Sequence, residues 1–395
     1  MSKVKTAIVI GGGIAGPVTA LALHKAGVEA TVYEAYPRTT DGIGGTLSLA
    51  PNGVAALGVL GVDDIVTRIA TPVLRQTLAI GGKRVEMTGL TGLPPMRQVH
   101  RNDLHRGLHD RAVAAGVAFE YGRRLVGAEE TATGITARFA DGGEATADIL
   151  IGADGVRSTV RGLIDPDEPG PDYTGLLGFE AVARHEVGVE PGTMMFTFGK
   201  GGYYLYWPEP GGGTRWGVNL PQERPMSLTE ARAVPPSEWM RKLRDTFAED
   251  DPGRDLMRTS DAGELQVVGS LHILRSVARW HRGRMVLVGD SAHAPSNSSG
   301  QGASLAIESA VQLARCVRDL PDATSAFAAF ERLRRGRVEK VAARAARINH
   351  AKAPGPIGRV LMPLMMSLMF KTVANPEKTL GPEQRYVIDW DARVA

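Results

Sequence analysis

The sequence has 395 residues, enough for two domains or one large domain, and its 43% hydrophobic and 23% charged residues are typical of a globular protein. Its 46 Lys and Arg residues exceed its 43 Asp and Glu residues by only three, so the charge does not indicate a nucleic-acid partner. A single cysteine, Cys316, excludes an internal disulfide and a thiolate metal site, and it favours a cytoplasmic location.

The N-terminal residues predict a strand, a glycine-rich turn, a helix and a second strand. Residues 6–10 and 30–33 are short apolar runs, and residues 17–26 have helical character. Between the first strand and the helix, Gly11, Gly13 and Gly16 have the spacing G-x-G-x-x-G, and Glu34 ends the second strand. The glycines permit a tight turn, the approach of a pyrophosphate and close packing of helix on strand, while the carboxylate can accept from ribose hydroxyls. We therefore predict a dinucleotide site that also includes Ile14, Ala15 and Ala35.

Two later stretches also end an apolar strand on an acidic residue. One precedes Asp154 and Gly155, and the other precedes Asp290. Small residues follow Asp290, and a helix is predicted to begin between Gly300 and Ser304. A carboxylate can bind a ligand hydroxyl, and the free N–H groups of a helix start favour an electron-rich group. A flavin fits both ends of this layout.

The remaining patterns indicate the fold class. Four antiparallel strands are predicted at residues 117–121, 127–131, 135–139 and 145–147, and residues 173–221 alternate with the period of two that is typical of a sheet with one exposed face. Residues 303–319 and 323–349 predict long helices. We expect an α/β fold with a Rossmann-like FAD-binding domain (residues 1–172 and 279–350), an inserted, mostly antiparallel β-sheet substrate domain (173–278) and a C-terminal helical segment and tail (351–395).

A Met-rich and Leu-rich stretch at residues 357–370 is interrupted by Arg359 and Pro363. It is shorter than the roughly 20 residues that a membrane span needs. We interpret it as a core or dimer-contact segment of a monomer or homodimer.

Three of these stretches together resemble a known family. Residues 11–16 with Glu34, residues 151–161 and residues 288–302 match, in order and spacing, the single-component (group A) FAD-dependent monooxygenases similar to p-hydroxybenzoate hydroxylase. The similarity extends from about residue 5 to about residue 350. Residues 44–49 and 100–104 are similar to the tetracycline-modifying and antibiotic-tailoring branch of that family.

The resemblance implies bound FAD and transient NADPH or NADH. The glycines and Glu34 would hold the AMP half of FAD, and Arg101 and Asp290 would bind its middle. Asp154 and Gly155 would border the flavin and the path of the nicotinamide. The predicted helix start would face the flavin pyrimidine ring, where its dipole stabilises the negative charge of the reduced flavin. The expected set is completed by Gly45, Leu125, Gly300, Gly302, Ala303 and Ser304.

Substrate contacts are predicted on the period-two strands. Tyr204 and Tyr206 share one face of a strand, while Glu180 and Trp216 fall where related enzymes contact their substrates. The alternative is that these aromatic residues are simply core. Asn297 stands where the family usually has proline, which indicates a substrate that is polar there, altered oxygen chemistry at the flavin, or neutral drift in a loop.

Two further positions bear on the chemistry. Ser309 stands where the family usually has aspartate, and His293 is either a base or a residue that braces its loop. We favour bracing and assign no catalytic side chain, because a flavin itself carries the difficult chemistry.

The function implied by the resemblance is NAD(P)H-dependent hydroxylation or epoxidation of an electron-rich aromatic or polyketide-like small molecule. Dioxygen would be the second substrate, and a flavin hydroperoxide would be the oxygen donor. Two alternatives remain: a FAD-dependent oxidoreductase or cyclase that inserts no oxygen, and a non-catalytic protein that binds flavin or a drug.

Overall fold

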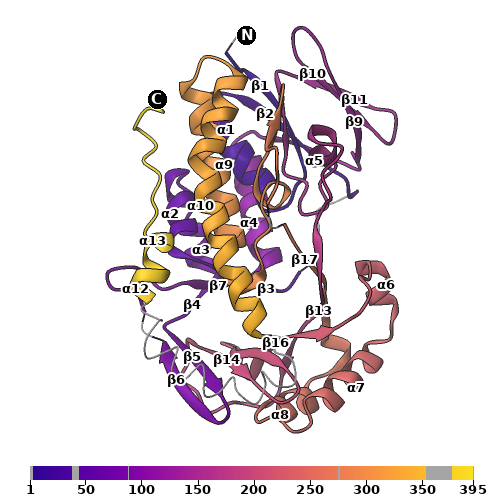
Figure 1. Ribbon diagram of the computed structural model, residues 1–395, viewed down its shortest axis with the longest axis vertical. Helices are drawn as coiled ribbons and strands as arrows, with labels where there is room; N and C mark the ends of the chain where they lie inside the picture. The colour runs from indigo at the N-terminus through magenta and orange to yellow at the C-terminus, as the bar shows by residue number, and fades with distance from the viewer. Residues whose placement is uncertain (1–2, 38–43, 88, 275, 353–375, 395) are drawn as a thin grey trace.

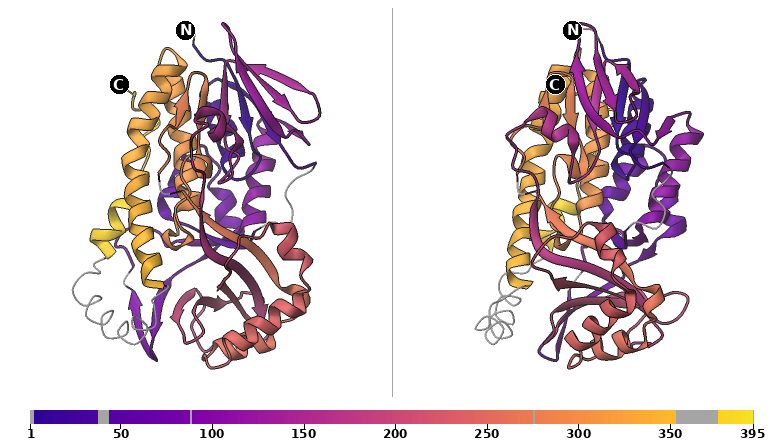
Figure 2. Two further views of the ribbon diagram at one scale, coloured as in Figure 1. Left: turned by 45° about the vertical axis from the view of Figure 1, so that its right-hand side comes forward. Right: turned by 90° about the vertical axis from the view of Figure 1, so that its right-hand side faces the viewer.

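The computed structural model describes residues 3–37, 44–87, 89–274, 276–352 and 376–394. A mostly parallel sheet with its helices lies at one end of the long axis, and a larger sheet lies at the other (Figure 1). Strands β13 (Asp172–Ala183) and β17 (Gln266–Ile273) extend between the two parts (Figure 2). The expected mixed α/β fold is thus confirmed.

The sheet near the N-terminus has six strands, and three of its inner strands, β19 (Met285–Leu287), β12 (Ile149–Gly152) and β1 (Thr6–Ile10), are mostly apolar. Val9, Ile149 and Ile151 are fully buried, as expected for parallel strands covered on both faces. The prediction of an antiparallel strand at 117–121 is wrong, because Ala118–Tyr121 pairs in parallel with the second strand of the βαβ unit. In spatial order the strands are β18 (His281–Arg282), β19 (Met285–Leu287), β12 (Ile149–Gly152), β1 (Thr6–Ile10), β2 (Glu29–Glu34) and β8 (Ala118–Tyr121).

Helices cover this sheet, and the longest of those described, α10 (Ala323–Lys352), runs beside the C-terminal residues (Figure 1). In α9 almost every residue is buried because the helix packs against α1, α2 and α10. The helices of this part are α1 (Ala15–Lys25), α2 (Pro51–Val59), α3 (Asp64–Ile69), α4 (Arg101–Ala114), α5 (Thr159–Ile164), α9 (Gly302–Asp319) and α10 (Ala323–Lys352), with short 3-10 turns η2 (Gly289–Ser291) and η3 (Asn297–Ser299).

Two three-stranded sheets flank the parallel sheet. The first is the antiparallel unit expected within residues 117–147. The second pairs two short strands antiparallel to a central strand at residues 97–100. Their strands are β9 (Leu125–Glu130), β10 (Ile135–Phe139), β11 (Glu144–Ala147), and β3 (Thr46–Leu49), β7 (Arg97–His100), β4 (Thr71–Pro72).

The larger sheet has seven strands, and two of them come from residues 75–87, which the expected division placed in the FAD-binding domain. The hairpin of β5 (Arg75–Ile80) and β6 (Lys83–Met87) belongs to this sheet, because β5 pairs in parallel with β14 (Thr193–Phe198). The sheet also contains β13, β17, β15 (Tyr203–Pro208) and β16 (Thr214–Pro221). One of its faces is covered by apolar side chains of α7 (Pro236–Thr246) and α8 (Gly253–Thr259), beside α6 (Leu228–Ala233) and η1 (Ala262–Glu264).

The described C-terminal residues run back along the long helices. Trp390 lies 4.6 Å from the Arg318 guanidinium, and Glu383 forms an ion pair with Arg344. Two short helices, α12 (Pro376–Thr379) and α13 (Gly381–Gln384), precede this tail. None of the described helices is long and apolar enough to cross a membrane, and the Met-rich stretch at 357–370 lies outside the described residues.

Candidate active site

The turn after β1 is one that only glycine can form. Gly11 has φ +103°, and a Cβ there would lie 2.5 Å from the carbonyl oxygen of Ala153. A Cβ on Gly16 would lie 2.0 Å from the carbonyl oxygen of Gly11, so helix and turn could not pack this closely. A Cβ on Gly13, by contrast, would meet no atom within 4 Å. The first and third glycines thus serve the turn and the packing, while the second leaves the backbone open to a ligand.

The N-terminus of α1 has no internal cap. No side chain accepts from its first N–H groups, and its first turn has no acidic residue. Free N–H groups and the helix dipole favour a phosphate at such a position. The helix begins two residues before the predicted start, with Ile14 at the N-cap and Ala15 as its first residue, and their contact with a ligand stays a prediction.

His105 supports this turn, although the sequence analysis did not identify it. Its Nε2 lies 2.7 Å from the carbonyl oxygen of Gly12, and burial lowers the pKa of its ring. A neutral ring that donates from Nε2 fits this contact. The position of His105 in α4, four residues after Arg101, was the available signal.

Glu34 ends β2 with its carboxylate against the glycine turn. One carboxylate oxygen accepts from the N–H of Gly12 at 2.7 Å, and the other accepts from the N–H of Tyr36 at 2.9 Å. Ala35 continues the chain from this point, and Leu125 is buried at the start of β9 nearby, where Arg123 N–H donates to the Glu34 carbonyl. The carboxylate is therefore held beside the turn, and its contact with a ribose stays a prediction.

Asp290 and Arg101 come from distant parts of the chain and interact electrostatically. Asp290 lies in η2 after β19, and burial raises the pKa of its carboxyl, which the charge of Arg101 opposes. Within the described part of the chain, no hydrogen bond to this carboxylate is found. Arg101 begins α4, and its side chain packs so closely on Gly44 that a Cβ there would lie 2.6 Å from Arg101 Cδ. Gly45 accepts from the Arg101 N–H at 3.2 Å.

Asp154 is engaged by the start of α5. Its carboxylate accepts from Ser158 Oγ at 2.5 Å and from the N–H groups of Thr159 and Val160 at 2.7 and 3.1 Å. Burial raises the pKa of Asp154 against these hydrogen bonds. Gly155, with φ +77°, lets the chain turn into this helix. The contact of both residues with a nicotinamide stays a prediction.

The start of α9 is the second uncapped helix N-terminus of the site. Gly300 has φ +61°, and no side chain caps the N–H groups at Gly302 and Ala303. Ser304 Oγ instead accepts from the N–H of Ala50 at 3.0 Å, which ties α9 to the start of α2. Gly289 lies between the two helix starts, since a Cβ there would lie 3.0 Å from Ala15 Cβ and 3.2 Å from Ala306 Cβ.

A fully buried charge cluster supports α9 from behind. Glu308 forms ion pairs with Arg334 at 2.6 Å and with Arg337 at 2.7 Å, and the side chains of Glu308 and Arg334 are completely buried. Asn52 Nδ2 donates both to Glu308 at 2.6 Å and to Gln301 Oε1 at 3.0 Å. The helix start at Gly302 is thereby linked to α2 and α10.

His293 is part of the same support. Its Nε2 lies 2.9 Å from Ser309 Oγ in α9, and its ring lies 5.6 Å from that of Trp280. Burial, reinforced by the charge of Arg334, lowers the pKa of His293 to about 3. The ring is therefore neutral and packed between elements, which is the bracing arrangement expected from the sequence.

Three predicted substrate contacts lie on the wrong face of the large sheet. Tyr204 and Tyr206 are buried against α7 and α8, where Tyr204 packs edge-on against Phe247 and donates to the carbonyl of Asp251. Trp216 is fully buried beside them and donates from Nε1 to Ser260 Oγ at 2.8 Å. These residues form the core under the helices, as the alternative reading held, and their assignment to the substrate is corrected.

The opposite face of the sheet meets the FAD-binding part. There Glu180 accepts from the N–H and Oγ1 of Thr46, at 2.8 and 2.7 Å, and pairs with Arg215 at 3.0 Å. Asn297 begins η3 just before the α9 start and is exposed. Both residues lie on the expected side, and their contact with a substrate remains a prediction.

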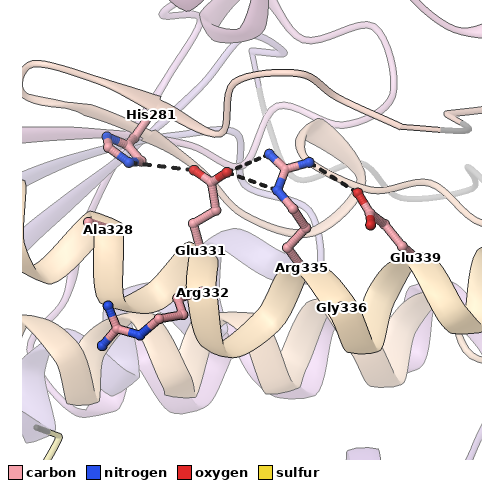
Figure 3. Close-up of a pocket in the computed structure, with 7 residues that line it drawn as sticks. All are labelled: His281, Ala328, Glu331, Arg332, Arg335, Gly336 and Glu339. Carbon is pink, nitrogen blue, oxygen red and sulfur yellow. Dashed lines mark hydrogen bonds and ion pairs between the residues drawn. The ribbon is translucent and has the colours of Figure 1, made fainter.

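A surface cavity of about 490 Å³ lies outside these motifs, along α10. Figure 3 shows four of its side chains joined in a row, with Arg335 between Glu331 and Glu339, and His281 next to Glu331, while Arg332 extends away from the row. Because the acidic and basic groups pair with one another, we interpret this cavity as a solvated helix surface.

The donor set fits FAD. Gly289 packs between the first residue of α1, beside the open Gly13, and Ala306 of α9, and neither helix start has a side-chain cap. Asp290 follows, half-buried and with no protein hydrogen bond to its carboxylate among the described residues. Phosphates suit the first helix, ribityl hydroxyls suit the carboxylate, and an electron-rich ring suits the second helix. In the described residues, no group of His, Cys, Asp and Glu could hold a metal ion.

Comparisons with known proteins agree with this geometry. Residues 3–320 match the family described as FAD binding domain. The FAD-dependent urate hydroxylase of Klebsiella pneumoniae is 29% identical, covering 88% of this chain and 91% of the relative. The 3-amino-4-hydroxybenzoate 2-monooxygenase of Streptomyces cremeus is 31% identical, covering 86% of each chain.

Solved structures extend the comparison to the fold. Klebsiella pneumoniae HpxO complexed with FAD and uric acid superposes with a TM-score of 0.81 at 26% identity, covering 96% of each chain. The tetracycline destructase Tet(51) has a TM-score of 0.70 at 19% identity, covering 99% of this chain and 100% of the other, and this likeness shows the fold alone. The chain therefore belongs to the FAD binding domain family, among the single-component FAD-dependent monooxygenases.

Proposed function

We propose that this monooxygenase uses NADPH or NADH and dioxygen to hydroxylate a small, electron-rich aromatic molecule. The observation that carries the proposal is that Gly289 packs between Ala15, the first residue of α1, and Ala306 in α9, two helices whose starts have no side-chain cap, with Asp290 directly after it. Relatives that act on urate and on an aminohydroxybenzoate support an aromatic substrate.

Each part of FAD has its own residues in this proposal. Gly11, Gly13 and Gly16 would hold the pyrophosphate at the α1 start, with Glu34 on the adenosine ribose. Arg101 and Asp290 would bind the middle of the cofactor. FAD when bound supplies electron transfer from the nicotinamide and the activation of dioxygen.

The protein itself positions and shields the reactants. The α9 start supplies a positive dipole end, which Glu308 and Asn52 hold in place through Gln301. The large sheet closes the opposite side, joined to the FAD-binding part by Glu180 and Thr46. This arrangement keeps water from the reacting groups.

The test is a reconstitution followed by a turnover assay. The purified chain should bind FAD, be reduced by NADPH or NADH, and transfer an atom of isotopically labelled dioxygen into a phenol or related aromatic. The variant Gly16→Ala should lose FAD, because its Cβ would collide with the Gly11 carbonyl oxygen, while Gly127→Ala, where a Cβ has open space, should retain it. Product without labelled oxygen would instead indicate an oxidoreductase or cyclase, and no reduction by either nicotinamide would indicate a carrier.

A further inference from the structure

Arg215 is the only Lys or Arg in the four central strands β13 to β16 of the large sheet. It lies on the face toward the FAD-binding part, opposite Trp216. A guanidinium at such a position is the usual means of holding a carboxylate ligand, because its fork matches the two oxygens.

The guanidinium is already neutralised by the protein. Its Nη1 donates to Glu180 at 3.0 Å, and its Nε and Nη2 donate to the two oxygens of Glu209 at 2.9 and 3.0 Å. Burial acts to lower the pKa of Arg215, but its hydrogen bonds with Glu209 and the charges of both glutamates raise the pKa overall. The three side chains are largely buried and together carry two negative charges and one positive charge.

Glu180 is held in its ion pair with Arg215 by further hydrogen bonds. Both of its oxygens are also bound by Thr46, through the backbone N–H and the hydroxyl. Thr46 begins β3, which pairs with β7 in the FAD-binding part. A ligand carboxylate that displaced Glu180 would therefore break a contact between the two parts of the molecule.

The neighbours of Arg215 on this face are apolar, beginning with Trp207, its cross-strand partner. Trp207, Met194 and Val73 form a small buried cluster, with Met96, Phe196 and Leu205 packed against it. The polar groups that reach the cluster are amides, since Gln76 and Gln98 donate to the sulfur atoms of Met96 and Met194. Met96 also lies beside Gly300, because a Cβ there would be 3.5 Å from Met96 Cε. The cluster thus borders the loop before α9.

We propose that the site takes an uncharged aromatic substrate and rejects the corresponding carboxylate. This inference rests on the proposed function, because it concerns the same site. A carboxylate on this face would meet apolar groups and a cluster with a net negative charge, and a charge buried without a partner is strongly unfavourable. A neutral ring would meet aromatic and thioether groups, with amides available for a hydroxyl or amino substituent.

The experiment compares matched pairs on the FAD-loaded enzyme. Dissociation constants are measured by titration calorimetry for a panel that includes 2-naphthol with 3-hydroxy-2-naphthoate, and methyl 3-hydroxybenzoate with 3-hydroxybenzoate. The neutral member of each pair that binds should bind at least about tenfold more tightly. Equal or tighter binding of the carboxylates overturns the inference, as does a panel in which no neutral member binds.

Charge variants give an independent readout. Glu209→Gln removes one negative charge and frees two donors of Arg215, so carboxylate affinity should rise by about tenfold while neutral affinity stays within about twofold. The control Glu249→Gln changes an exposed glutamate that pairs with Lys200, and it should leave the ratio unchanged. An unchanged ratio in Glu209→Gln as well would contradict the inference.

The two proposals fail in different ways. Binding is measured by calorimetry and does not depend on turnover, whereas FAD content and reduction by NADPH are recorded on the same sample. Normal reduction with a preference for carboxylates overturns only the substrate class. Loss of FAD binding or reduction overturns the proposed function.

Discussion

Replacing Glu308 with glutamine tests how much the buried charge cluster contributes to stability. Glu308 accepts from Asn52 and Arg337 and forms an ion pair with Arg334, and neither Glu308 nor Arg334 has any exposed side-chain surface. Burial acts to raise the pKa of Glu308, but the charges of Arg334 and Arg337 outweigh it and hold the pKa below its usual value. The carboxylate is therefore charged at neutral pH, and its removal leaves Arg334 as a buried, uncompensated cation.

The expected cost follows from that change. Breaking a buried ion pair by removing one partner costs about 3–5 kcal/mol, because the other charge stays buried. We expect Glu308→Gln to lower the free energy of unfolding by this amount. The double variant Glu308→Leu with Arg334→Met should recover at least half of the loss, since an apolar pair of similar volume removes the fully buried cation, and Arg337 keeps its hydrogen bond to the carbonyl of Glu383.

Urea denaturation followed by tryptophan fluorescence and circular dichroism measures these values. The control is Glu249→Gln, which removes a partner of an exposed ion pair and should leave the denaturation midpoint unchanged. A loss below about 1 kcal/mol for Glu308→Gln, or a double variant less stable than the single one, would refute the reasoning that the buried charges depend on one another.

Three further predictions concern other parts of the molecule. Gly11→Ala should abolish FAD binding, measured as flavin absorbance after purification, because alanine is strained at φ +103° and its Cβ would lie 2.5 Å from a carbonyl oxygen. For His293, the pKa of about 3 in the folded protein lies below the value near 6.5 in the unfolded chain. The neutral ring therefore contributes its full stability above pH 6.5, and this contribution declines as the pH falls toward 3. The denaturation midpoint of His293→Gln should accordingly fall less steeply than that of the wild type between these pH values. Tyr204→Phe should lower the free energy of unfolding by about 1 kcal/mol, since it removes one hydrogen bond to the Asp251 carbonyl in the core under α7 and α8, and it should leave the substrate KM within about twofold. A large change in KM would instead indicate that Tyr204 contacts the substrate.

The parallel sheet and the glycine turn could be predicted from the sequence because their signals are local. Residues 7–10, 149–152 and 285–287 carry no polar side chain, as expected for strands buried on both faces. The glycine spacing reflects contacts between residues that are close in the sequence, since a Cβ on Gly16, for example, would collide with the carbonyl oxygen of Gly11. The antiparallel strand at Ile135–Phe139 also has the predicted bounds, since a tight turn follows it directly.

Other features depend on pairing between distant residues, which no short window contains. The β5–β6 hairpin joins the large sheet because Arg75 to Ile80 pair in parallel with Thr193 to Phe198. Likewise, β8 resembles its antiparallel neighbours in sequence, and only its pairing with β2 places it in the parallel sheet. His105 and Asn52 were missed for the same reason, because their partners Gly12 and Glu308 lie far along the chain.

The aromatic strands show a different limit. Period-two alternation placed Tyr204 and Tyr206 together correctly, but it does not say which neighbour a face packs against. The missing information lies in α7, whose Trp239, Met240 and Leu243 form an apolar stripe that must be buried. That stripe packs on the tyrosines and leaves the face of Arg215 and Leu205 to the FAD-binding part.

Ser309 gives the departures from the family a physical meaning. Its hydroxyl lies 2.9 Å from His293 Nε2 and 3.3 Å from Arg334 Nε. His293 and Arg334 thus have a neutral hydroxyl where the family usually has a carboxylate. With His293 neutral, Glu308 is the sole carboxylate between Arg334 and Arg337, and these groups carry a net positive charge behind the α9 start. That charge has the same sign as the helix N-terminus, so both favour a negative ligand in front of it. Because aspartate at 309 would cancel this charge, the serine strengthens the preference of the helix start for an electron-rich ring.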